Sequence, residues 1–187
     1  MLYDCKLYCV KRYWRRRTDY EITQSAKEAV LPRVKQAFES THESDCPYDC
    51  LCHNVDEKRV ATVVNQFSNN RLNWTYAVYV VECRPRRVSQ RVAREQLRLQ
   101  NPSKWVEKAQ KHNRLVYVGV SQNVVNRLMQ HAAGRGGGAN FIQLFPVSRL
   151  LSIQWFSGRS AAYRAEELTA EMLEDELSGD VYVAQPG

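Results

Sequence analysis

Two tyrosines, an arginine, a histidine and a glutamate are spaced through the second half of the chain in an order that could carry chemistry. Tyr79 and Tyr117 each lie in a short apolar run, and Arg127 and His131 stand four residues apart, so that they share one face of a helix. Glu166 follows in a later helical segment. A forked, permanently charged guanidinium can stabilise phosphoryl oxygens, and one carboxylate can hold Mg²⁺, which keeps most of its waters. A tyrosine, with a pKa of about 10, needs a neighbouring cation before it can act as a base at neutral pH. These residue types suit the hydrolysis of a phosphodiester.

The elements that must position these side chains are predicted from hydrophobic periodicity and turn residues. Runs rich in aromatic and β-branched residues predict strands, whereas apolar residues recurring every three or four positions predict helices. Ser121 and Ser160 are placed to cap two of the helices, and Pro32 and Pro102 each interrupt one. The strands are expected over residues 74–83, 115–120 and 150–156, and the helices over 23–39, 56–67, 88–109, 122–131 and 161–176. Three strands with helices between and after them predict an α/β or α+β sandwich.

The order and spacing of these motifs resemble the GIY-YIG nuclease family. The specific part runs from Tyr117 to His131, where a Tyr-Val-Gly triplet leads into the pattern Ser-x-Asn-Val-x-x-Arg-Leu-x-x-His. A weaker first triplet ends at Tyr79, and Ala162 stands four residues before Glu166, as the family pattern requires. The resemblance covers residue 74 to about residue 176.

The resemblance implies a small three-stranded antiparallel sheet flanked by helices, and a metal-dependent endonuclease acting on DNA, with RNA not excluded. Tyr117 would then be the general base, while Tyr79 orients the attacking water or supports the base. Arg127 would stabilise the phosphoryl oxygens. His131 would hydrogen-bond the scissile phosphate or relay a proton. Glu166 would hold Mg²⁺ or Mn²⁺.

Several positions depart from the family pattern. Ala77 stands in place of the first glycine, and Val120 stands where the family often has lysine. Gln185 is the nearest substitute for an asparagine that several members carry after the glutamate. Glu167, beside Glu166, is a second candidate for the metal role. Because a supporting cation is missing at Val120, the alternative is a nucleic-acid-binding module that kept the fold and lost the chemistry.

Positive charge is concentrated in two segments of the chain. The formal net charge is +7 and the pI about 9.2. Between Arg84 and Arg114 ten Lys or Arg stand against two Glu, a local balance of +8, and a second basic block runs from Lys11 to Arg17. Concentrated cations attract a phosphate backbone because they release its counterions. The expected substrate-binding residues are Gly119, Asn123, Arg84, Arg86, Arg87, Arg91, Arg15, Arg16 and Arg17.

The sequence carries no visible membrane or secretion signal. No run approaches the ~20 apolar residues of a membrane helix, and the first residues lack the order of a secretory signal, so we expect an intracellular protein.

The cysteines form a second group of potential ligands. In the reducing interior of a cell they are expected to be free thiols or metal ligands rather than disulfides. A structural zinc site on Cys46, Cys50, Cys52 and His53 is one interpretation, and small buried thiols are the other. A zinc-dependent regulator that binds proteins is a further alternative function.

An asparagine-rich break before residue 74 marks the expected domain boundary. Residues 1–73 are expected to form a basic, mostly helical region, stabilised by zinc if the cysteines bind it. Residues 74–187 are expected to form the nuclease-like domain, with residues 84–114 as a basic helical insertion. The oligomeric state stays open.

Overall fold

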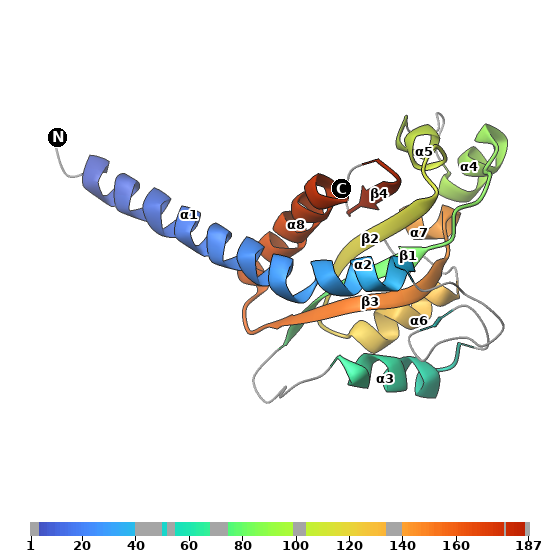
Figure 1. The fold of residues 1–187 in the computed structure, drawn as a ribbon, viewed down its shortest axis with the longest axis horizontal. Helices are drawn as coiled ribbons and strands as arrows, with labels where there is room; N and C mark the ends of the chain where they lie inside the picture. The colour runs from blue at the N-terminus through green and yellow to red at the C-terminus, as the bar shows by residue number, and fades with distance from the viewer. Residues whose placement is uncertain are drawn as a thin grey trace.

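The computed structural model describes residues 4–39, 50–51, 55–67, 75–98, 104–133, 140–177 and 179–185, with side chains described from residue 17 onward. Helices lie on both faces of a mixed sheet, so that the protein has a mixed α+β architecture (Figure 1). Among the helices of these ranges, none is long and apolar enough to cross a bilayer.

The sheet has four strands in the order β3-β1-β2-β4. Central β1 pairs antiparallel with β2 and β3, and β4 adds to β2 in the parallel direction. The sequence predicts three antiparallel strands, whereas the sheet has a fourth strand, β4, that is parallel to its neighbour. That strand is only four residues long, too short for its alternation to stand out in the sequence. The strands are β1 (Tyr76–Cys83), β2 (Arg114–Ser121), β3 (Val147–Phe156) and β4 (Val181–Ala184).

The helices divide between the two faces of the sheet. Because both faces are covered, β1 and β2 are buried almost without interruption and do not alternate between apolar and polar residues. One face is covered by α3 (Glu57–Gln66), α4 (Gln90–Leu97), α5 (Lys104–Ala109), α6 (Val124–Ala132) and α7 (Asn140–Leu144). The other is covered by α1 (Asp4–Ala29), α2 (Leu31–Glu39) and α8 (Arg159–Glu176).

The N-terminal helices contribute to the core of the sheet. Val30 and Val34 are buried in one cluster with Val78 and Val118 of the central strands. Helix α1 continues beyond the sheet toward its N-terminus (Figure 1). The break between α1 and α2 falls at Val30, so that Pro32 lies in the first turn of α2, where its missing N–H is tolerated.

The caps of two helices differ from those expected. Asn123 caps α6 by accepting a hydrogen bond from the backbone N–H of Asn126 at 3.0 Å, while Ser121 accepts from the N–H of Asn123. Helix α8 has Gly158 at its N-cap position, so that Ser160 lies inside the first turn. Both serines are predicted to be caps from their residue type, but each helix has its N-cap two residues away from the serine.

The expectation of free or metal-binding cysteines is wrong at Cys50. This residue is disulfide-bonded, so its sulfur is not a thiolate that could bind zinc. Cys83 is a buried free thiol, as expected. The other members of the expected zinc site, Cys46, Cys52 and His53, lie outside the described residues.

Candidate active site

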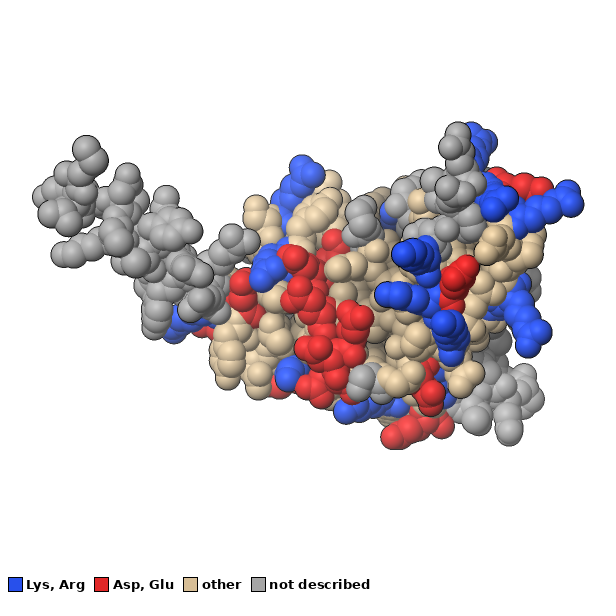
Figure 2. All heavy atoms as spheres, turned by 90° about the horizontal axis from the view of Figure 1, so that it is seen from above, with Lys and Arg blue, Asp and Glu red and all other residues tan. Residues whose placement is uncertain are grey.

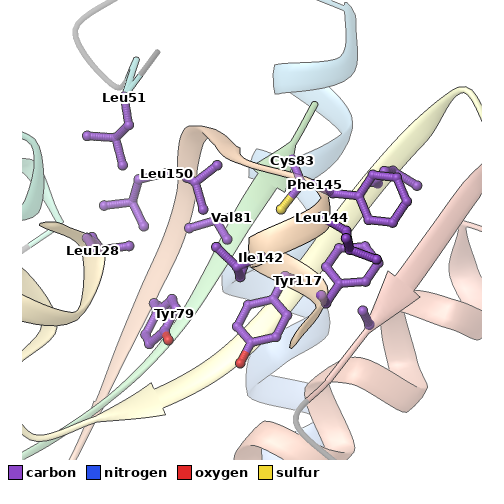
Figure 3. Packing of buried hydrophobic residues seen from close by; sticks show 14 of the residues in the cluster. Leu51, Tyr79, Val81, Cys83, Tyr117, Leu128, Ile142, Leu144, Phe145 and Leu150 are labelled. Carbon is purple, nitrogen blue, oxygen red and sulfur yellow. The ribbon is translucent and has the colours of Figure 1, made fainter. Parts of the chain in front are cut away.

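Strands β1 and β2 bring the two tyrosines together. Their register pairs Tyr79 with Gly119 and Tyr117 with Val81, which places both phenol rings on the same face of the sheet. The ring centroids are 6.4 Å apart, and both side chains are buried. Both hydroxyl groups point to the same end of the apolar cluster that surrounds the rings (Figure 3).

Gly119 makes room for both phenols. A Cβ at this position would lie 2.5 Å from the hydroxyl oxygen of Tyr79 and 2.8 Å from Cε1 of Tyr117. Contacts this short cannot be accommodated without moving one of the rings. The glycine of the second triplet is therefore required by the position of the tyrosines and not by a turn.

Helix α6 places Arg127 and His131 against the tyrosines, as their four-residue spacing predicted. The His131 ring is fully buried, and its Nε2 lies 2.9 Å from the hydroxyl oxygen of Tyr79. The same ring packs edge-on against Tyr117, with centroids 5.7 Å apart. His131 is thus held inside the site by both tyrosines.

Burial keeps the Tyr79–His131 pair neutral. It lowers the pKa of His131 to about 3, helped by the charge of Arg127. It also raises the pKa of Tyr79 to about 12, although a hydrogen bond from Arg127 and its charge act in the opposite direction. A neutral phenol that accepts from Arg127 directs its own proton to Nε2 of His131. The imidazole proton then resides on Nδ1.

Helix α8 brings Glu166 to the open edge of β2. Strand β4 pairs with β2 only as far as Tyr117 within the described residues, so the edge beyond it is not covered by a strand. There the backbone N–H of Val120 donates to the Glu166 carboxylate. The side chain is only 7% exposed, and burial raises its pKa to about 7 against the effects of Val120 and Arg127.

The same groups act on one another electrostatically. The negative charge of Glu166 raises the pKa of both Tyr79 and Tyr117, and the positive charge of Arg127 lowers both. Burial is the main reason that the pKa of Tyr117 lies far above its usual range. The predicted set of two phenols, a guanidinium, an imidazole and a carboxylate is therefore brought together in space.

Several polar atoms of this cluster have unused hydrogen-bonding capacity. The Tyr117 hydroxyl, Nδ1 of His131 and Oε1 of Glu166 are buried without a hydrogen-bond partner in the described part of the chain, as is the hydroxyl of Thr169, one turn after Glu166. Buried polar atoms in folded proteins are usually paired, and each exception calls for an explanation. Three of these four atoms belong to residues that were selected from the sequence for chemistry, Tyr117, His131 and Glu166.

The carboxylate of Glu166 fits the modest demand of a Mg²⁺ ion. Nowhere in the described ranges do three or more Asp, Glu, His or Cys side chains form a metal cage. Mg²⁺ needs no such cage, since it binds through one or two carboxylates, water and substrate phosphates. Oε1 of Glu166 is available for it, whereas neighbouring Glu167 is exposed and paired with Arg164.

The basic insertion does not join this cluster. Arg84 follows the end of β1 and lies about 17 Å along the strand direction from Tyr79, counting five residues at ~3.4 Å each. Arg86 donates hydrogen bonds to the carbonyl oxygens of Gln143 and Leu144, and Arg91 pairs with Glu95 on the surface. This separation depends on the direction of β1, which the charge of residues 84–114 does not reveal.

Other residues that were expected to bind substrate lie elsewhere or have structural roles. Asn123 is occupied as the cap of α6, and Arg17 pairs with Glu21 on the exposed surface of α1. The side chains of Arg15 and Arg16 lie outside the described residues. Gln185 is exposed just beyond β4.

Two features of α8 were missed in the sequence. Arg164 forms a two-pronged ion pair with Asp19, with N–O distances of 2.9 and 2.8 Å, and so ties α1 to the helix that carries Glu166. Arg159 and Tyr163 border a surface pocket beside the site. Their spacing from Glu166, at seven and three residues, was a signal for a shared helix face that could have been noticed.

One known protein family matches part of this chain. Residues 107–175 match the family model of the GIY-YIG catalytic domain, which confirms the resemblance over the segment that carries Tyr117, Arg127, His131 and Glu166. Tyr79, on β1, precedes the matched segment. No curated protein and no solved structure matches the chain.

Proposed function

We propose that this protein is a metal-dependent endonuclease that hydrolyses phosphodiester bonds of DNA. The observation that carries the proposal is the convergence of Tyr79, Tyr117, Arg127 and Glu166 around polar atoms that lack protein partners. A site built of one cation, one available carboxylate and two phenols matches the needs of phosphoryl transfer to water. The family match over residues 107–175 supports the same class of reaction.

Arg127 and Tyr117 have the most direct roles in this proposal. The guanidinium of Arg127 neutralises charge that develops on the phosphoryl oxygens. The Tyr117 hydroxyl, which has no protein partner among the described residues, holds the attacking water. It accepts the proton of that water as a phenolate, after its own proton has left to solvent, and the charge of Arg127 favours this ionised form against the effect of burial. A bound Mg²⁺ on Glu166 would supply positive charge at the phosphate and acidify nearby water.

Tyr79 and His131 have a supporting role. The phenol of Tyr79 is already engaged by His131 and Arg127, so it orients the neighbouring groups rather than meeting the water first. A histidine whose pKa is lowered to about 3 stays neutral during the reaction and fixes Tyr79 through Nε2. A proton relay, one of the two roles expected for His131, would require the imidazole to become cationic, which its lowered pKa disfavours.

A second candidate is a nucleic-acid-binding module without catalysis. It is favoured by the raised pKa of both phenols and by Val120 at the position where related nucleases often have lysine. Both candidates bind DNA, so only turnover separates them.

Nicking of supercoiled plasmid with added Mg²⁺ tests the proposal. We expect wild type to nick, and Glu166→Ala and Arg127→Ala each to lose about 10²–10³-fold in rate, because each removes a charge from the site. Glu167→Ala is the matched control, since it deletes the adjacent but exposed carboxylate, and it should retain activity. Binding of DNA by wild type without nicking of any duplex, branched or single-stranded substrate would favour the non-catalytic module. The same assay on RNA decides whether the activity is confined to DNA.

A further inference from the structure

A surface pocket of about 270 Å³ adjoins the Glu166 side of the candidate active site, on the face of the sheet that α8 covers. Val120 belongs to both, since it lines the pocket and its backbone N–H binds the Glu166 carboxylate. On α8, Arg159, Tyr163 and Glu166 are spaced at four and three residues and so lie along one face of the helix. A ligand in this pocket is therefore adjacent to the carboxylate proposed to hold the metal.

The pocket presents a flat surface for a planar ligand. Tyr163 is 48% exposed, which is unusual among the large apolar side chains described in this chain. The Cζ atom of Arg159 lies 5.3 Å from the centre of the Tyr163 ring, a cation–π arrangement that orients both groups. Tyr76, at the start of β1, adds a second, partly buried ring. Aromatic rings and guanidinium planes are the surfaces on which unpaired bases stack.

The polar groups of the pocket suit the edge of a nucleobase. Ser121 and Gln122 supply a hydroxyl and an amide, which can donate and accept hydrogen bonds. The described residues that line the pocket include no Asp or Glu, so nothing in this lining repels a nucleotide phosphate. Its volume lies just below the range of ~300–1,000 Å³ typical for drug-sized ligands, and so suits a single base.

We propose that this pocket holds one unstacked nucleobase beside the scissile phosphate, so that the preferred substrates are nucleic acids with unpaired nucleotides at the cut. This inference rests on the proposed nuclease function and names its substrate class. A base in an intact duplex is stacked on its neighbours and cannot lie against Tyr163 without leaving the helix. Forks, flaps and single strands present such a base at no unpairing cost.

The test measures binding and cleavage of one forked DNA that carries 2-aminopurine at successive junction positions. In the Glu166→Gln background, stacking on Tyr163 should change the 2-aminopurine fluorescence at one position, and Tyr163→Ala should abolish that change and weaken binding about ten-fold. Tyr163→Phe should preserve both, because it keeps the ring. Tyr20→Ala is the control, since it removes another exposed tyrosine, from α1.

The outcomes separate this inference from the proposed function. If wild type cleaves forks while Tyr163→Ala binds and cleaves them like wild type, the pocket assignment fails and the nuclease stands. If nothing is cleaved but the Tyr163-dependent signal is present, the base-binding pocket stands and catalysis fails. Equal cleavage of fork and intact duplex, with equal binding by all variants, also overturns the inference.

Discussion

If Glu166 holds the metal as we propose, its protonation decides whether the cation can bind. Burial raises the pKa of its carboxyl to about 7, so near neutral pH the proton and the metal compete for the same oxygens. A raised pKa means that the ionised form is scarce below pH 7 and dominant above it. The environment that prepares the site for a metal therefore also makes it sensitive to pH.

We expect the apparent Mg²⁺ affinity to rise with pH through about 7. At pH 6 about a tenth of the Glu166 side chains are ionised, so the apparent Mg²⁺ affinity should be about ten-fold weaker than at pH 8. Raising the Mg²⁺ concentration should shift the midpoint of the pH–rate profile to lower pH. Isothermal titration and nicking assays between pH 6 and 8 measure this. An affinity that does not vary over that range would contradict the assignment.

Gly119 is the residue whose substitution should separate folding from activity. Gly119→Ala would force a Cβ to within 2.5 Å of the Tyr79 hydroxyl, and displacement of the phenols should lower the nicking rate about 10²-fold. Gly158→Ala is the control, because an added Cβ there meets nothing within 4 Å. Circular dichroism should show both variants folded. Full activity in Gly119→Ala would show that the phenols need not occupy these positions.

Among the elements, α2 is anchored to the sheet by a cluster of charges. Glu82 on β1 pairs with Arg149 on β3 at 2.9 Å and with Arg114 on β2 at 3.4 Å. The two guanidinium groups also donate to the carbonyl oxygens of Ala37 and Phe38 in the last turn of α2. They thereby satisfy carbonyls that the end of a helix leaves unpaired.

We expect Glu82→Gln to destabilise the protein by about 3 kcal/mol, because it leaves the Arg149 guanidinium, which is 3% exposed, without its carboxylate. Glu95→Gln, which removes the exposed partner of Arg91, should cost less than about 0.5 kcal/mol. Urea unfolding followed by circular dichroism gives both values. Similar losses in the two variants would mean that the buried cluster does not stabilise the fold.

Most elements were predictable from the sequence because each has a local pattern. The aromatic and β-branched runs gave β1, β2 and β3, and the three- and four-residue periodicity gave α3, α6 and α8. The five residues selected for chemistry were found because their order matches a family pattern, and the structure brings them together. Their roles stay predictions.

The features that were missed depend on tertiary contacts. Strand β4 is defined by its pairing with β2, and the five-residue helix α7 by packing of Phe141 and Ile142 into the core. The burial of His131, and hence its neutrality, depends on both tyrosines. The distance between the basic insertion and the site depends on the direction in which β1 runs.

At the scale of the whole molecule, opposite charges occupy different regions of the surface. Acidic side chains form a band on α8, and basic side chains gather at the end that carries α4 and α5 (Figure 2). The exposed acidic residues of α8 are Glu167, Glu171, Glu174, Asp175 and Glu176. A nucleic acid is therefore repelled from the outer face of α8 and attracted toward the α4–α5 end.

We expect the α4–α5 end to contribute to affinity but not to the chemical step. Replacing Arg87 and Arg91 together by alanine should reduce the slope of log affinity against log salt by about 2, if each contacts one phosphate. The nicking rate at saturating DNA should be unchanged, because these residues lie far from Tyr79 along the sheet. Lys35→Ala, on the opposite face of the sheet, is the control. An unchanged slope would mean that DNA takes another path.

The contribution of Val30 and Val34 to the core affects where this chain can be truncated. A fragment that starts at residue 74 would carry the matched family segment, yet it would expose Val78 and Val118 to water on the side that the first two helices now cover. It would also remove Asp19, one of the two carboxylate partners of Arg164, which stands two residues before Glu166. Such a fragment would tend to self-associate through its bare face, and its inactivity would say nothing about the activity of the intact protein.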